Sequence, residues 1–165
     1  MSKRKCDFQE QLRKWFADAH RIVIAGIGNP IRTDDFVGVK VVRDLRGKVA
    51  KQVLLIECET VPESFVQQIT DFNPTRILLI DAALMGLKSG SIRIVEPEEL
   101  ISLPAFSTHM LPLRMFCDYL GTTIRARIAL LLVEPERTDF GEGLTPKIEA
   151  TEKAIVETLL FVLKC

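Results

Sequence analysis

Short apolar segments alternate with segments of helical periodicity along this chain, and that alternation constrains the fold more than any other sequence feature. Strands that alternate with helices indicate a parallel sheet covered by helices on both faces. The sequence therefore predicts a three-layer α/β/α domain with a mainly parallel sheet of about five strands. The expected strands are residues 21–26, 52–57, 76–81, 91–96 and 127–133, of which 91–96 alternates polar and apolar side chains as an edge strand does.

Two of the expected helices have recognisable first turns, and a third has a recognisable end. Asp7 and Glu10 form a capping-box pattern at the start of the first helix. Residues 112–120 have the spacing of a short helix, which Gly121 is expected to stop. Proline is well placed in the first turn of a helix, so Pro146 marks the start of the last one.

Length and charge narrow the class of protein. A chain of 165 residues is expected to form a single domain over residues 1–165. The 22 Lys and Arg residues balance the 22 Asp and Glu residues, so no global charge favours nucleic acid or an anionic membrane. The basic first residues are followed by polar ones rather than by the apolar core of a secretory signal. The longest apolar runs, such as 128–133, are too short to span a bilayer, so a cytoplasmic protein is expected.

The four cysteines form no CxxC pair and no zinc-type spacing. In a reducing cytosol they are expected to be free thiols that mostly serve packing. Cys58 follows a predicted strand, so it is the cysteine expected nearest to a site at the strand ends.

Three polar residues stand where a parallel sheet would place an active site. Asp35 lies beyond the glycine-rich turn at 26–30, Asp81 closes the strand at 76–81, and His109 precedes a predicted helix. Ligands of open α/β sheets bind outside the carboxyl ends of the strands. Two carboxylates and an imidazole are suitable ligands for a transition metal. Asp35, Asp81 and His109 are therefore the predicted catalytic and metal-contacting residues.

Simpler roles compete with this interpretation. Asp34 is a good N-cap for the helix that follows it, which leaves Asp35 to project from the first turn. Capping of the next loop explains Asp81 equally well, and a lone histidine is more often structural than a ligand. The turn lacks the third glycine of a dinucleotide fingerprint, since Ile31 stands in its place, and no Walker lysine follows. Its glycines are expected to serve a tight turn.

At these residues the chain resembles the hydrogenase maturation endopeptidases. The resemblance runs from Ile22 onward and rests on residues 26–30, Asp34, Asp35, Gly38, Asp81, Ala82, His109 and 143–146. Residues 73–76, 85–87, 92–94 and 108–113 look closest to the branch that serves formate-hydrogenlyase-type hydrogenases, known as hydrogenase 3.

The resemblance implies a specific reaction. Members of the family remove the C-terminal extension of the [NiFe]-hydrogenase large-subunit precursor, and their metal-contacting trio falls on Asp35, Asp81 and His109. In the family the trio senses nickel already inserted in the precursor. The resemblance therefore implies that the substrate supplies the nickel and that the enzyme is a small monomer without a resting metal. Nickel would polarise the scissile carbonyl or a water, and one carboxylate would act as base. Which carboxylate does so stays open.

One segment departs from the family pattern. After the second strand the family commonly shows an acidic residue and two glycines, whereas this chain has Glu57, Cys58 and Glu59. Because glycine has the larger conformational freedom, a stiffer loop beside the cleft is expected here.

Two other functions remain as alternatives. Peptidyl-tRNA hydrolases, also α/β enzymes, share a Gly-x-Gly-Asn-Pro turn, but they need a histidine shortly after it, where this chain has Asp34 and Asp35. The balanced charge also disfavours tRNA. A non-enzymatic metal- or anion-binding module would bind nickel by itself and cleave nothing.

Overall fold

The computed structural model describes residues 3–103 and 110–164. Five strands form one sheet in the order β2-β1-β3-β5-β4. The predicted, mainly parallel sheet is confirmed, and the edge segment pairs antiparallel with its neighbour. The strands are β1 (Ile22–Ile27), β2 (Val53–Glu59), β3 (Arg76–Ala82), β4 (Ile92–Val95) and β5 (Arg127–Val133).

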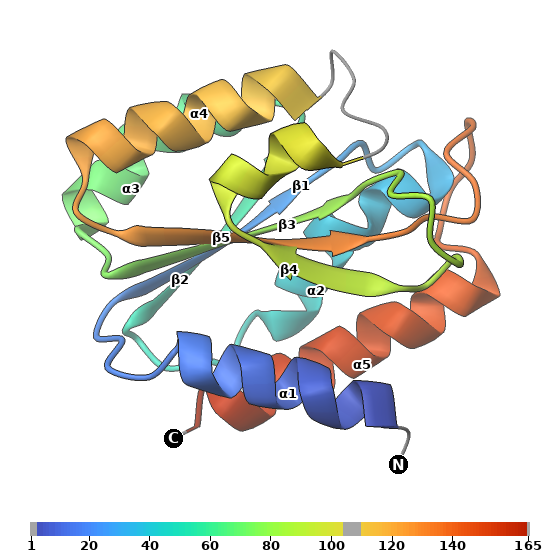
Figure 1. Ribbon diagram of the computed structural model, residues 1–165, viewed down its shortest axis with the longest axis horizontal. Helices are drawn as coiled ribbons and strands as arrows, with labels where there is room; N and C mark the ends of the chain where they lie inside the picture. Colours follow the sequence, from blue (N-terminus) through green and yellow to red (C-terminus); the bar gives the residue numbers. More distant parts are fainter. Residues whose placement is uncertain (1–2, 104–109, 165) are drawn as a thin grey trace.

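Helices cover both faces of the sheet, as Figure 1 shows. One face packs against α1 (Lys3–Trp15), α2 (Val37–Leu45) and α5 (Pro146–Val162). The other packs against α3 (Val66–Phe72) and α4 (Met110–Thr123). The described connections contain the short 3₁₀ helices η1 (Thr33–Phe36), η2 (Pro62–Phe65) and η3 (Pro97–Ser102). No helix within the described residues combines the length and apolarity needed to cross a membrane.

The strand β3 lies in the middle of the sheet, and this position explains the continuous apolar run at residues 77–80. Ile77 and Leu79 belong to the core beneath α3 and α4, whereas Leu78 and Ile80 belong to the core beneath α2 and α5. All four side chains are fully buried. A strand buried on both faces loses the polar alternation of a surface strand, so the polar side chains of β3 stand at its two ends, Arg76 at the start and Asp81 before the last residue.

The predicted first turn of the first helix is wrong. The helix α1 begins at Lys3, so Asp7 lies inside it rather than at its N-cap. Glu10 instead accepts hydrogen bonds from the Arg13 guanidinium, with a shortest distance of 2.7 Å. A glutamate and an arginine three residues apart meet on the surface of a helix, and this pairing replaces the capping box.

The predicted end of the fourth helix is also wrong. The helix α4 continues through Gly121 to Thr123. Glycine inside a helix costs about 1 kcal/mol relative to alanine, and tertiary packing overrides that preference. The buried Leu120 and Ile124 flank Gly121 and join the core, so the last turn stays helical.

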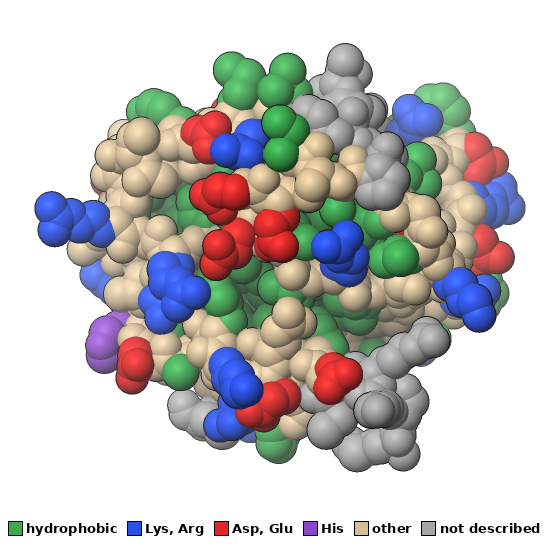
Figure 2. All heavy atoms as spheres, viewed as in Figure 1, with side chains coloured by type: hydrophobic (Ala, Val, Ile, Leu, Met, Phe, Trp, Pro, Cys, Tyr) green, Lys and Arg blue, Asp and Glu red, His purple; other side chains and the backbone are tan. Residues whose placement is uncertain are grey.

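On the face in Figure 2, Lys and Arg side chains are spread around a group of acidic side chains near the middle. The described part of this face therefore mixes both signs of charge, in keeping with the balanced composition.

Candidate active site

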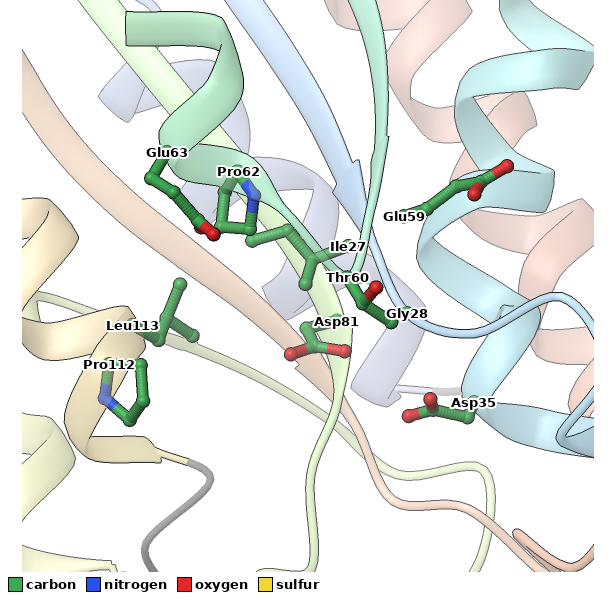
Figure 3. A pocket seen from close by; sticks show the side chains of 10 residues that line it. All are labelled: Ile27, Gly28, Asp35, Glu59, Thr60, Pro62, Glu63, Asp81, Pro112 and Leu113. Atoms are coloured by element: carbon green, nitrogen blue, oxygen red, sulfur yellow. The ribbon is translucent and has the colours of Figure 1, made fainter.

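A cavity of about 390 Å³ lies where β1, β2 and β3 end (Figure 3). Four of its lining residues are acidic, namely Asp35, Glu59, Glu63 and Asp81. The structure thus brings two predicted site residues, Asp35 and Asp81, to one cavity. His109 lies outside the described residues, and α4 begins directly after it at Met110. The remaining lining residues are Ile27, Gly28, Thr60, Pro62, Pro112 and Leu113.

Asp35 is placed by the turn after β1. Its Oδ2 accepts a hydrogen bond from the Asn29 N–H at 2.8 Å, which holds the carboxylate on the cavity side of η1. Gly28 has φ +138°, and a Cβ built on it would lie 1.8 Å from the Asp35 carbonyl oxygen. Only glycine tolerates both that backbone conformation and that approach. The turn therefore serves conformation and close packing, as the sequence predicts.

A direct backbone contact then fixes the start of α2 against the sheet. A Cβ on Gly38 would lie 2.1 Å from the Ile80 carbonyl oxygen, and one on Gly26 would lie 2.3 Å from the Gly38 carbonyl oxygen. Side chains at these two positions would push the helix away from β1 and β3. Because Asp35 precedes this contact by three residues and Asp81 follows Ile80, the contact sets the two carboxylates beside each other.

The acidity of the Asp81 carboxyl is strongly perturbed. Burial raises the pKa of its carboxyl well above the ordinary value, and the nearby charge of Asp35 raises it further. A hydrogen bond from the Ala82 N–H to Oδ1, at 2.8 Å, works in the opposite direction. Asp81 therefore holds its proton to higher pH than an ordinary aspartate, and this is the type of perturbation found at functional sites.

Asp34 does not cap the following helix, so that prediction is wrong. Its carboxylate is fully buried and accepts hydrogen bonds from the backbone N–H groups of Glu136, Arg137 and Thr145, at 2.8–3.0 Å. The Thr145 hydroxyl donates to it as well. Neither η1 nor α2 has a side-chain cap. Asp34 instead joins η1 to the segment between β5 and α5.

The segment Glu57–Glu59 belongs to β2 and is not a loop, which corrects the sequence prediction. The register of β2 on β1 shifts, so that Gly26 pairs with Glu57 and Ile27 with Glu59. Cys58 is buried in the core beneath α3 and α4, and burial raises the pKa of its thiol to about 12. Cys58 directly precedes Glu59 and Thr60, which line the cavity, but it is not itself a lining residue.

Sequence reasoning missed the two glutamates that line the cavity. Glu59 stands with a left-handed φ of +51°, and its carboxylate points away from Asp81 in Figure 3. Glu63, in the first turn of η2, points into the cavity. The one available signal was the replacement of a family glycine by Glu59, whereas Glu63 reads from sequence as an ordinary residue of a helix start.

The carboxylates of Asp35 and Asp81 suit a divalent metal by their chemistry, since oxygen donors bind such ions. Within residues 3–103 and 110–164, no third His, Cys, Asp or Glu side chain completes a metal-binding group with them. The described part of the site therefore offers a pair of acidic side chains at one wall of an open cavity.

Known proteins are similar to this chain in sequence and in fold. The family model described as hydrogenase maturation protease matches residues 39–161. The chain belongs to the hydrogenase maturation protease family. It is accordingly a peptidase, and the expected family and enzyme class are confirmed.

Individual members of the hydrogenase maturation protease family match over most of their length. A Methanocaldococcus jannaschii protein named as a candidate member is 33% identical, with 94% of this chain and 96% of the relative covered. The hydrogenase 3 maturation protease of Escherichia coli is 27% identical, covering 83% and 87% respectively. The crystal structure of a [NiFe] hydrogenase maturation protease, HycI from Thermococcus kodakarensis, is 34% identical, with a TM-score of 0.87 over 94% of this chain and 99% of that one.

Proposed function

We propose that this maturation protease removes the C-terminal extension of a [NiFe]-hydrogenase large-subunit precursor after nickel insertion. The observation that carries the proposal is the meeting of Asp35 and Asp81 at one cavity, in a family of maturation proteases. Its similarity to the hydrogenase 3 maturation protease supports a hydrogenase 3-type substrate as the finer choice. We further propose that it acts as a single-domain monomer in the cytoplasm.

The nickel belongs to the substrate in this proposal. The precursor would present its metal to Asp35, Asp81 and His109, and the metal would supply the polarisation of the scissile carbonyl or of a water. Two carboxylates and one imidazole leave room for the precursor's own ligands, because nickel binds nitrogen and sulfur at least as well as oxygen. Cleavage is then confined to precursors that already contain nickel.

A general base must be ionised and must point at the reacting groups when the substrate arrives. We assign this role to Asp35, because the Asn29 N–H holds its Oδ2 and the carboxylate is directed into the cavity. A metal ligand must be deprotonated, so Asp81 would meet the precursor's nickel as a carboxylate.

A trimming assay tests the proposal. Nickel-loaded, zinc-loaded and metal-free precursors are incubated with the enzyme, and the large subunit is followed by intact-mass spectrometry. We expect trimming of the nickel form alone, and losses of roughly 10²-fold or more in Asp35→Asn, Asp81→Asn and His109→Ala, with unchanged circular dichroism. Asp71→Asn, on the outer surface of α3, is the matched control and should trim normally.

The rival functions predict other results. A metal-binding module would bind nickel tightly in calorimetry and leave every precursor intact. Efficient cleavage of the metal-free precursor would refute the nickel requirement while leaving the peptidase activity in place. A peptidyl-tRNA hydrolase finds no support among the matched proteins.

A further inference from the structure

The buried carboxylate of Asp34 sits one residue before Asp35 and performs no chemistry that the proposed function requires. We propose that Asp34 is a positioning residue, which holds Asp35 in the cavity by fastening η1 to residues 134–145, the segment between β5 and α5. The proposal rests on the proposed function of Asp35 and adds a residue to the machinery of the same reaction.

Both carboxylate oxygens of Asp34 are engaged. Oδ2 accepts hydrogen bonds from the Glu136 and Arg137 N–H groups at 2.9 and 3.0 Å. Oδ1 accepts one from the Thr145 N–H at 2.8 Å, and the Thr145 hydroxyl lies 3.0 and 2.9 Å from the two oxygens. Hydrogen bonds to an ionised acceptor are the stronger kind. The carboxylate is therefore a fixed anchor and is not free to contact substrate.

The backbone repeats this attachment beside Asp34. The Thr33 N–H donates to the Gly141 carbonyl at 3.1 Å, and the Gly141 N–H donates to the Ile31 carbonyl at 3.0 Å. The Thr33 hydroxyl donates to the Asp139 carbonyl at 2.6 Å. Thr33 itself has φ +49°, a left-handed conformation that a β-branched residue adopts only when its surroundings enforce it. The two segments thus form one unit, with Asp34 at its buried centre.

Asp34 is joined to Asp35 by one peptide bond, so the anchoring of Asp34 limits how far Asp35 can move. In Figure 3 the Asp35 carboxylate is directed into the cavity toward Asp81. Asp34 accordingly anchors one side of η1, while the Asn29 N–H orients Asp35 on the other. Loss of the anchor would let η1 shift relative to β3, and a displacement of about 1 Å in a reacting group can cost on the order of 10²-fold in rate.

The kinetic test compares Asp34→Asn with Leu159→Ala. The asparagine variant keeps the shape but turns one acceptor into a donor that faces N–H groups. Leu159 is fully buried in the core between α5 and the sheet, so its truncation destabilises the fold without removing a hydrogen bond of Asp34. At a temperature where both are folded, Asp34→Asn should lower kcat for nickel-loaded precursor at least about 10-fold and leave KM within about two-fold. Leu159→Ala should keep the wild-type kcat.

A second readout is independent of activity. The Asn29 amide signal in a ¹⁵N–¹H spectrum reports the hydrogen bond to Asp35. It should move in Asp34→Asn and stay in place in Leu159→Ala. If Asp34→Asn does not fold, Thr145→Val removes one donor alone and should still lower kcat several-fold and shift the Asn29 signal.

The outcomes separate the two proposals. A wild-type kcat with an unmoved Asn29 signal in the folded Asp34 variant, or in Thr145→Val where that variant does not fold, would overturn the positioning role. An equal kcat loss in Leu159→Ala would overturn it too, because general destabilisation would then suffice. If the wild-type enzyme leaves nickel-loaded precursor intact, the proposed function fails, and the role of Asp34 as an anchor is still decided by the Asn29 signal.

Discussion

Glu59 occupies a backbone conformation that suits glycine, and replacing it should stabilise the protein. It lies at the end of β2 with φ +51°, and its carbonyl oxygen accepts a hydrogen bond from the Gly28 N–H at 2.8 Å. That bond and the pairing with Ile27 hold the left-handed conformation in place. The side chain is exposed and lines the cavity.

The expected gain follows from two opposing effects. A left-handed conformation costs an L-residue roughly 1–2 kcal/mol, and Glu59→Gly removes that cost. The greater freedom of glycine in the unfolded chain returns about 0.4–1 kcal/mol. The net stabilisation should be about 0.5–1 kcal/mol, which raises the melting temperature of a chain of this size by about 1–4 °C.

The matched control is Glu59→Ala, because it removes the carboxylate and keeps the Cβ. Urea unfolding and thermal melting of the wild type and both variants measure the difference. Glu59→Gly should be the most stable of the three, and Glu59→Ala should lie within about 0.5 kcal/mol of the wild type. If alanine stabilises as much as glycine, relief of charge explains the gain and the argument from backbone strain is refuted.

Two further predictions concern buried groups. Burial and the charge of Asp44 raise the pKa of Glu152 from 4.5 to about 7. The folded protein therefore tolerates Glu152 best in its protonated form. The contribution of Glu152 to the free energy of unfolding is complete below pH 4.5 and is lost as the pH rises through 7. Glu152→Gln should therefore be more stable than the wild type by on the order of 1–2 kcal/mol at about pH 8, and urea unfolding should show a smaller gap at about pH 4; a gap independent of pH would contradict this. Burial raises the pKa of Cys58 and Cys117 to about 12, so both should resist a thiol reagent in the folded protein and react in urea, as peptide mass mapping would show. Rapid labelling of either thiol in the native state would disprove it.

The local pattern of the sequence was sufficient to predict the three layers of the fold and the position of the Asp35 and Asp81 carboxylates. Apolar runs of strand length, separated by helical spacing, indicate a parallel sheet without knowledge of any contact. Asp81 then falls at the end of one strand and Asp35 beyond the turn that follows another, and parallel strands end at one edge. Their presence at one cavity follows from connectivity that the pattern already contains.

Only the tertiary structure decided the roles of other residues, such as Asp34 and Gly121. The sequence predicts that Asp34 caps a helix, because a sequence pattern shows only partners within about one helical turn. The groups that donate hydrogen bonds to Asp34 belong to Glu136, Arg137 and Thr145, more than a hundred residues away. Gly121 stays inside a helix because Leu120 and Ile124 pack into the core on either side of it. In each case a contact distant in sequence outweighs a local preference of about 1 kcal/mol, and such contacts exist only once the chain is folded.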